Sequence, residues 1–219
     1  MDGLRLKFTK TGRAAFISHL DLMRTMQRSF MRAGLPLKYS EGFNPHAIIS
    51  IALPLSVGTR SVCELMDFKL RAFMAEKELV YALSRTLPEG LRALDCYEPT
   101  RKFKEIKWLE INGRLDYDSR DINEMAAGLT EFFGREKLVI EKKSKSGTAP
   151  TDIAPGIHSV QLDTGAGAVY ISAVLSAQEP TVKPELLVSA LSQLEPSLAP
   201  DFAAFRRERI LDGEFGEFR

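Results

Sequence analysis

The 219-residue sequence predicts an α+β protein made of two similar halves. Three observations support this prediction. Short runs alternate apolar and polar residues as half-buried strands do, and other runs repeat apolar residues every three or four positions as amphipathic helices do. The order of these runs also restarts after about 100 residues. Each half is expected to follow the order β-α-β-β-α-β, so the fold is expected to be tandem ferredoxin-like, with antiparallel sheets.

In the first half, clear stops separate the predicted elements. Alternation over residues 4–9 predicts a strand. Ser18 is placed to cap a following helix, which ends near Ala33 because Gly34 and Pro36 stop it. The other predicted elements are strands over 47–53, 61–70 and 91–97 and a helix over 74–87. Residues 1–99 are expected to form the domain that carries the candidate site.

The second half repeats the order with weaker signals. Its predicted elements are strands over 104–111, 138–143, 169–175 and 206–211, a further strand considered over 157–162, turns over 144–151 and 163–167, and helices over 122–133 and 184–194. The segment 99–103 is the expected boundary. Residues 104–219 are therefore expected to form a second ferredoxin-like domain.

The composition restricts the class of protein. Hydrophobic residues make up 44% of the chain and charged residues 27%, which is typical of a chain that folds around a core. No apolar run reaches about 18 residues, so no membrane span is expected, and the N-terminal alternation leaves no room for a secretory signal. Cys63 and Cys96 are too few for a disulfide framework or a four-cysteine metal site. We expect a cytoplasmic, reduced protein without a cofactor.

Charge is distributed unevenly, although the net charge is only +1. Residues 1–60 contain nine basic and three acidic residues, a net charge of +6, and the remainder therefore carries −5. A basic region of this kind indicates either a polyanionic partner or an ordinary solvated surface. The sequence leaves both interpretations open.

Residues 16–54 hold the richest set of candidate functional groups. Arg24, Arg28 and Arg32 recur every four residues, so on a helix they form one stripe that can contact consecutive phosphates. In the loop that follows, Tyr39 and Phe43 are candidates for stacking on a base. The predicted nucleic-acid or anion site consists of Arg24, Arg28, Arg32, Tyr39, Phe43 and Asn44. The alternative interpretation is a solvated helix face.

His19 and His46 lie in the same segment and are the candidate catalytic residues of an alternative interpretation, acid–base chemistry in a small pocket. The loop 39–46 is long enough to return to the start of the helix and bring these histidines together. A metal site that adds Asp21 and either Cys63 or Glu64 to these histidines lacks the spacing of known zinc motifs. No metal is therefore predicted.

Several motifs in the first 70 residues carry a family resemblance. They are Arg5-Leu6-Lys7-Phe8, Ser18-His19-Leu20-Asp21, Arg32-Ala33-Gly34-Leu35-Pro36, Tyr39-Ser40-Glu41-Gly42-Phe43-Asn44-Pro45-His46 and Pro54-Leu55. With these motifs the chain resembles the radical-SAM-linked proteins, domains of unknown function found beside or fused to radical SAM enzymes with a B12-binding-like module. The resemblance implies a radical SAM protein as a partner. It does not imply a cluster in this chain, because two cysteines cannot supply a three-cysteine cluster motif.

We therefore expect an accessory or substrate-presenting protein, non-catalytic and RNA-binding, that acts with a radical SAM enzyme in RNA or protein modification. A looser architectural likeness to the tandem ferredoxin-like RNA-binding proteins of CRISPR processing is analogy at the level of the fold. Two alternatives stay open. One is an enzyme with a small-molecule or nucleotide pocket that uses His19 or His46, and the other is a protein–protein adaptor whose apolar sheet face docks a partner.

Overall fold

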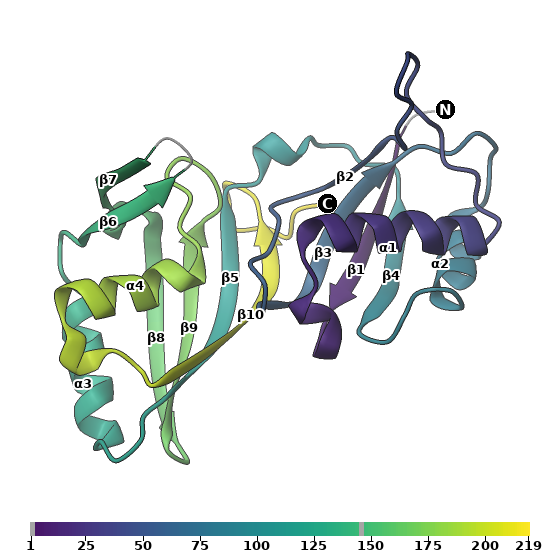
Figure 1. The fold of residues 1–219 in the computed structure, drawn as a ribbon. Helices are drawn as coiled ribbons and strands as arrows, with labels where there is room; N and C mark the ends of the chain where they lie inside the picture. The colour runs from purple at the N-terminus through teal and green to yellow at the C-terminus, as the bar shows by residue number, and fades with distance from the viewer. Residues whose placement is uncertain (1–2, 145–146) are drawn as a thin grey trace. The chain divides into compact units, whose positions relative to one another are not determined.

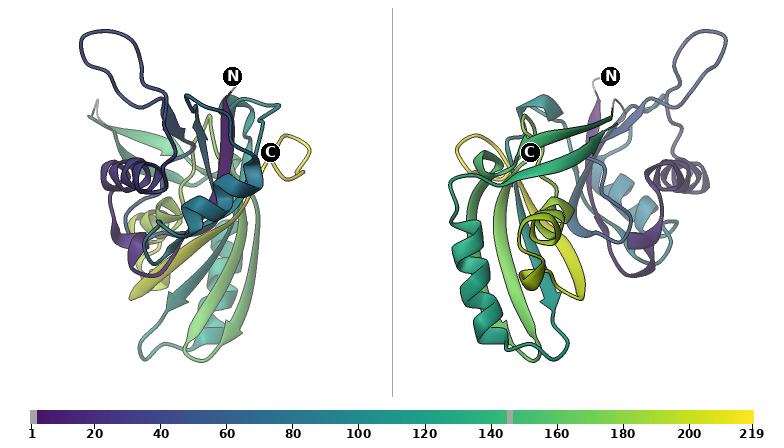
Figure 2. Two further views of the ribbon diagram at one scale, coloured as in Figure 1. Left: turned by 90° about the vertical axis from the view of Figure 1, so that its right-hand side faces the viewer. Right: turned by 60° about the vertical axis from the view of Figure 1, so that its left-hand side comes forward.

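A computed structural model describes residues 3–144 and 147–219 and shows a mixed α+β protein. The chain divides into two compact units. Unit 1 contains the described residues up to Glu105 together with Arg219, and unit 2 runs Ile106–Phe218. Within each unit, two α-helices pack on one face of an antiparallel sheet (Figures 1 and 2). No helix in the described part of the chain is long and apolar enough to cross a membrane.

The sheet of unit 1 has the strand order β4-β1-β3-β2. Its strands are β1 (Leu4–Lys10), β2 (Ile49–Ile51), β3 (Arg60–Phe68) and β4 (Leu91–Tyr97). Leu6 of β1 lies opposite Met66 of β3 and Cys96 of β4. Because residues paired across strands point to the same face of a sheet, these three buried side chains belong to one core.

The helices α1 (His19–Arg32) and α2 (Glu76–Ser84) cover that core. The hydroxyl oxygen of Ser18 accepts a hydrogen bond from the backbone N–H of Asp21 at 3.1 Å, which caps α1. On the inner side of α1, the Phe30 ring packs edge-on against Phe68 with 4.9 Å between ring centres. The helix predicted between Ser18 and about Ala33 is therefore confirmed.

The chain that follows α1 pairs with the chain that follows β3. Two backbone hydrogen bonds of 2.8 Å join them, from the N–H of Arg71 to the carbonyl of Pro36 and from the N–H of Lys38 to the carbonyl of Lys69. The strand predicted over 47–53 is shorter in the structure, because its first residues belong to a narrow hairpin. We call the segment 37–48 the hairpin; its tip projects away from the unit (Figures 1 and 2).

Arg5 is buried in the opposite face of this sheet and holds the chain that follows β4. Its Nε and Nη2 donate to the two carboxylate oxygens of Asp67 at 2.6 and 2.9 Å. Nη2 also donates to the carbonyl of Arg101 at 3.0 Å, and the guanidinium carbon lies 4.3 Å from the centre of the Phe103 ring. The prediction of a strand from residue 104 is therefore wrong at its start, because this segment folds over Arg5 as a short 3-10 helix.

The sheet of unit 2 has the strand order β10-β5-β9-β8. Its strands are β5 (Trp108–Asp116), β8 (Ile157–Gly165), β9 (Ala168–Ser176) and β10 (Phe202–Leu211), and its helices are α3 (Ile122–Phe133) and α4 (Pro184–Leu194). Gly113 of β5 lies opposite Phe205 and Ile171. A Cβ at Gly113 would come within 2.5 Å of the Phe205 ring. Because glycine has no side chain, that ring can lie over β5 at this position.

The strand predicted over 138–143 does not join this sheet. It forms β6 (Val139–Ser144), which pairs with β7 (Gly147–Asp152) in a separate two-stranded ribbon. The turn prediction for 144–151 is wrong from Gly147 onward, and residues 145 and 146 lie outside the described residues. A two-stranded ribbon tolerates Pro150 because every strand in it has an open edge. The position in the main sheet belongs to β8, in the region considered as a further strand.

Replacing Gly90 with alanine should destabilise unit 1 more than replacing Gly34. Both glycines have positive φ, +88° and +70°. A Cβ at Gly90 would lie 2.3 Å from the carbonyl oxygen of Thr11, whereas nothing lies within 4 Å of one at Gly34. Gly34→Ala should therefore carry only the conformational cost, about 1–2 kcal/mol.

For Gly90→Ala we expect a loss of about 3 kcal/mol or more in the free energy of unfolding, measured by urea denaturation. Equal losses for the two variants would show that the chain around Thr11 moves aside without cost, and would contradict the close packing described for this turn.

Candidate nucleic-acid interface

Arg24 and Arg28 lie on the outer face of α1 and are available to an anion. Arg28 is exposed, and no carboxylate in the described part of the chain lies within ion-pair distance of it. Nη1 of Arg24 lies 3.4 Å from Oδ1 of Asp21, but both side chains are largely exposed, so the pair is weak. Asp21 is also engaged by the Ser18 hydroxyl, which donates to it at 2.7 Å. This part of α1 therefore presents positive charge to solvent.

Arg32 also lies on the predicted stripe, but the structure gives it a further partner. Its Nη2 donates to the carbonyl of Thr86 at 2.8 Å and to Oγ of Ser29 at 3.1 Å. Thr86 follows α2, so the guanidinium joins the end of α1 to the end of α2. The stripe available to a ligand therefore consists of Arg24 and Arg28, and it is shorter than the three-arginine stripe predicted from the sequence.

Two basic residues counted in the charge of the first 60 residues are buried. Arg5 is held by Asp67, and Nζ of Lys10 donates to the carbonyl of Ala15 at 2.8 Å. The basic surface is smaller than the sequence count implies. Arg71, which lies beyond residue 60, adds to it.

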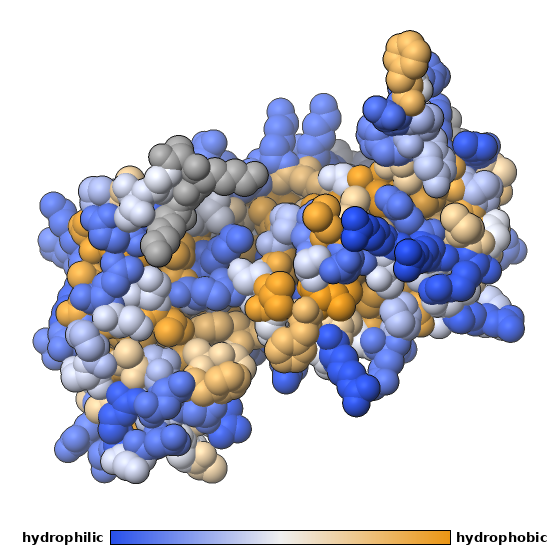
Figure 3. Space-filling model, in the orientation of Figure 1, coloured by the Kyte–Doolittle hydropathy of each residue, from blue (hydrophilic) through white to orange (hydrophobic). Residues whose placement is uncertain are grey.

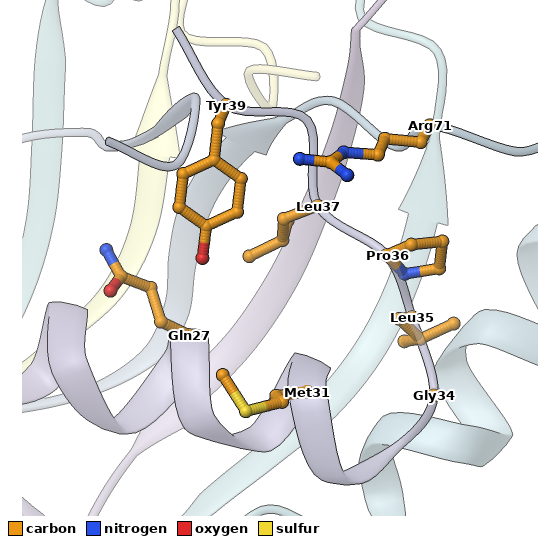
Figure 4. A pocket seen from close by; sticks show the side chains of 8 residues that line it. All are labelled: Gln27, Met31, Gly34, Leu35, Pro36, Leu37, Tyr39 and Arg71. Carbon is orange, nitrogen blue, oxygen red and sulfur yellow. The ribbon is translucent and has the colours of Figure 1, made fainter. Parts of the chain in front are cut away.

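A groove of about 370 Å³ lies between α1 and the segment 34–39 (Figure 4). Gln27 and Met31 line it from α1, and Tyr39 and Arg71 line it from the other side. The rest of its lining is apolar, formed by Leu35, Pro36 and Leu37 together with Gly34. The guanidinium carbon of Arg71 lies 5.7 Å from the centre of the Tyr39 ring, a cation–π contact at the rim of the groove.

The hairpin carries the two aromatic residues of the predicted site. Tyr39 and Ala47 form an antiparallel bridge at its base. The side chain of Phe43 at the tip is fully exposed, and that of Asn44 is exposed beside it. Figure 3 shows this tip standing clear of the surface around it. The hairpin therefore offers one aromatic ring beside the groove and a second one in open solvent.

The structure does not bring His19 and His46 together in any interaction or groove of the described residues. Nδ1 of His46 lies 2.9 Å from Oγ of Ser40, which also accepts the backbone N–H of His46 at 3.1 Å. These contacts close the hairpin on itself. The loop 39–46 therefore projects from the unit and does not pack against the start of α1 as predicted (Figures 1 and 2).

Apolar side chains gather beside the arginines. Phe16 ends a short 3-10 helix before α1, Leu20 lies in the first turn of α1, and both are 66% exposed. Val57 is 61% exposed, and the next residue, Gly58, donates its N–H to the carbonyl of Ala15 at 2.9 Å. Figure 3 shows hydrophobic residues around the N-terminal turns of α1 and hydrophilic ones along the rest of it. Exposed apolar clusters of this kind are typical of interaction surfaces.

Sequence reasoning missed Gln27, Met31 and Arg71. Met31 is 72% exposed and lies on the same outer face of α1 as Arg24 and Arg28. Helical spacing alone predicts this position, and an exposed methionine beside arginines is a recognisable signal of a binding surface. Arg71 has no comparable signal, because its position depends on the pairing of the chain around it.

Residues 3–184 match a sequence family described as "Uncharacterized protein conserved in bacteria (DUF2344)". The chain belongs to this family. Its description names neither RNA nor a radical SAM enzyme. No curated protein matches the sequence of this DUF2344 protein.

The solved structures that are similar to the DUF2344 chain include the following two. A chain of the "Crystal Structure of a Cbf5-Nop10-Gar1 Complex" superposes with a TM-score of 0.53 at 11% identity, over 98% of this chain and 50% of that one. A chain of the "Crystal Structure of an Unknown Protein from Galdieria sulphuraria" is 11% identical over 94% of this chain and 98% of that one, with a TM-score of 0.27. The DUF2344 chain spans half the length of the first, and the likeness concerns the fold alone.

The face of the unit 2 sheet opposite its helices carries polar pairs and also the exposed aromatic side chains of Tyr170 and Phe202. The Ser172 hydroxyl donates to Oδ1 of Asn112 at 2.8 Å, and Nη1 of Arg209 lies 3.2 Å from a carboxylate oxygen of Glu110. Solvated pairs of this kind are typical of a face in water. The adaptor alternative, in which an apolar sheet face docks a partner, stays a prediction.

Unit 2 also contains a group of three rings. The Phe215 ring centre lies 5.4 Å from that of Trp108 and 4.4 Å from that of His158. The Phe215 and Trp108 rings are stacked, so each covers part of the other's face. These rings leave less open face for a base than Phe43 in unit 1 does.

Both cysteines are buried. Burial, together with the smaller effect of the nearby carboxylates of Glu76 and Asp95, raises the pKa of the Cys96 thiol to about 12. Among the described residues, no group of three or more His, Cys, Asp or Glu side chains is placed to hold a metal ion.

The native protein should therefore react slowly with a thiol reagent at pH 8. With a pKa near 12, the Cys96 thiolate is about a ten-thousandth of the total at that pH, and burial also blocks access to both thiols. We expect release of two equivalents of thionitrobenzoate from Ellman's reagent only after unfolding in urea. Rapid release from the folded protein would contradict the burial of the cysteines.

Proposed function

We propose that this DUF2344 protein binds single-stranded RNA through α1 and the hairpin of unit 1, and that it acts as an accessory protein. The observation that carries the proposal is that Arg28 and Arg71, which have no ion-pair partner among the described residues, lie in the same unit as two available aromatic rings, Tyr39 beside Arg71 and the exposed Phe43 at the hairpin tip. Proteins that bind single strands combine these two groups, since cations contact the phosphates and aromatic rings stack on the bases.

The position of the charges favours a strand over a compact anion. Arg24 and Arg28 are separated by about 6 Å along the axis of α1, at 1.5 Å per residue. Arg71 lies across the groove from this helix. The charges therefore extend along a surface, as a phosphate backbone requires, and do not converge on one point.

The proposed partner is a radical SAM enzyme. The motifs that resemble radical-SAM-linked proteins support it, and they include the end of α1 and the hairpin. In this proposal the DUF2344 protein holds the RNA, and the chemistry belongs to the enzyme. The exposed cluster of Phe16, Leu20 and Val57 is a suitable contact surface for that enzyme, because it lies beside the arginines without covering the groove.

The enzyme alternative has less support. It depends on His19 and His46, which share no groove or contact in the described residues, and the imidazole of His46 is engaged by Ser40 in an exposed turn. General acid–base catalysis needs a positioned group within reach of a bound substrate.

The tandem ferredoxin-like interpretation of the fold belongs with this proposal. In unit 1 the chain order β1-α1-β2-β3-α2-β4 gives the spatial order β4-β1-β3-β2. In unit 2 the chain order β5-α3-β8-β9-α4-β10 gives β10-β5-β9-β8, with the ribbon of β6 and β7 inserted after α3. The two units thus repeat one arrangement, which supports a β-α-β-β-α-β module used twice.

Replacing Arg24 and Arg28 with alanine should weaken binding of single-stranded RNA. Each phosphate contact on a single strand contributes about 0.7 to the slope of log K against log salt concentration, so the slope should flatten by about 1 to 1.5 units. Neither side chain is buried, so each substitution should cost about 0.5 kcal/mol of stability or less. Fluorescence anisotropy with a labelled 12-mer at several salt concentrations measures both quantities.

The matched control is the double variant Arg114→Ala, Arg206→Ala. It removes the same net charge from two half-exposed arginines of unit 2 that are paired with Asp116 and Glu208. We expect wild-type affinity and slope from it. If both double variants lose the same affinity, the binding reports total charge and the α1 surface is not the site. Absence of RNA binding by the wild type at low salt would reject the proposal outright.

A further inference from the structure

We infer that the groove between α1 and the segment 34–39 binds one unpaired nucleobase of the RNA, with Tyr39 as its stacking surface. The inference rests on the proposed RNA binding and assigns a specific contact within it. Four features of the groove carry it: the position of its aromatic ring, its hydrogen-bonding group, its apolar lining and its charge.

The walls of the groove suit a flat, apolar ring. Figure 4 shows the Tyr39 ring directed into the groove, with the side chains of Met31 and Leu37 in the same space. A base placed there can stack on the tyrosine and contact the flexible thioether of Met31 with its other face. Pro36 adds a rigid apolar surface. The volume of about 370 Å³ leaves room for one base and its sugar rather than a folded helix.

Gln27 supplies a hydrogen-bonding group at the edge of the same space. In Figure 4 its side chain extends from α1 on the Tyr39 side of the groove, with the amide at the outer edge. A glutamine amide presents a donor and an acceptor side by side, and this pair matches the edge of an unpaired base. An apolar groove with one such group orients a planar ligand without binding every apolar molecule equally.

The positive charge at the rim of the groove is placed to contact a phosphate next to the bound base. The guanidinium of Arg71 lies 5.7 Å from the Tyr39 ring centre, and no carboxylate in the described part of unit 1 forms an ion pair with it. Arg28 does not line the groove, but it lies three residues before Met31 on α1, so these two side chains are neighbours on the helix surface. The backbone of a strand whose base occupies the groove would therefore have Arg71 at the rim and Arg28 on the adjoining face of α1, and an uncharged ligand would leave both cations unused. Because the groove adjoins the arginines of α1, we assign it to a base of the single-stranded RNA.

The test compares a 12-mer of RNA with an abasic ribose-phosphate 12-mer that has the same number of phosphates. Wild type should bind the RNA at least tenfold more tightly, a difference of about 1.4 kcal/mol, within the range found for base–aromatic stacking. Tyr39→Ala should lose about tenfold in affinity for the RNA and keep its affinity for the abasic strand. Tyr39→Phe retains the ring and should behave as wild type.

The chain offers a matched control for Tyr39→Ala. Tyr81 on α2 is exposed and lies 5.7 Å from Arg85, the same separation as in the Tyr39–Arg71 pair, but it does not line this groove. Tyr81→Ala should leave both affinities unchanged. A circular dichroism spectrum and melting curve for each variant show that the fold is kept.

The outcomes separate the inference from the proposal on which it rests. If wild type binds neither strand, RNA binding itself fails. If wild type binds both strands equally, or if Tyr39→Ala lowers the two affinities by the same factor, the surface binds a backbone but the groove does not bind a base. A selective loss for the RNA strand in Tyr39→Ala alone supports the inference.

Discussion

The pairing of the chain after α1 with the chain after β3 determines the geometry of the candidate interface. The backbone bonds of Pro36 with Arg71 and of Lys38 with Lys69 form one edge of the hairpin and place Arg71 opposite Tyr39. Because these bonds involve only the main chain, they specify where the groove lies without specifying its chemistry. The side chains of Gln27, Tyr39 and Arg71 supply that chemistry.

The core of unit 1 holds this pairing in place. Leu37 and Leu70 are paired in an antiparallel bridge. Both are buried in the same apolar cluster as Phe30 and Phe68. Burying a leucine contributes about 1.5–3 kcal/mol, which is more than one exposed backbone hydrogen bond contributes. The groove therefore lies directly on the core, whereas the tip of the hairpin, with Phe43, lies beyond it. We expect the base of the hairpin to be rigid and the tip to adapt to a ligand.

Local signals made much of the fold predictable from the sequence, and long-range pairing explains the rest. The helix after Ser18 is predictable from its cap and its periodicity, and the helix over 122–133 from its periodicity, because both signals depend on neighbouring residues only. The choice between β6 and β8 for the main sheet is not predictable in this way, because it depends on which segment pairs with β9. The site shows the same division: the outward arginines of α1 follow from helical spacing, but the burial of Arg5 and the position of Arg71 depend on contacts with distant residues.

The central claim is that RNA meets unit 1 along α1 and the hairpin. Photo-crosslinking with a 4-thiouridine-substituted single-stranded RNA, followed by mass spectrometry of the protein digest, tests it most directly. Adducts are expected on peptides that contain Tyr39 or Phe43, because these rings are placed to stack on bases. Adducts confined to the ring group of Trp108, His158 and Phe215 in unit 2, or no adduct at low salt, would contradict the claim.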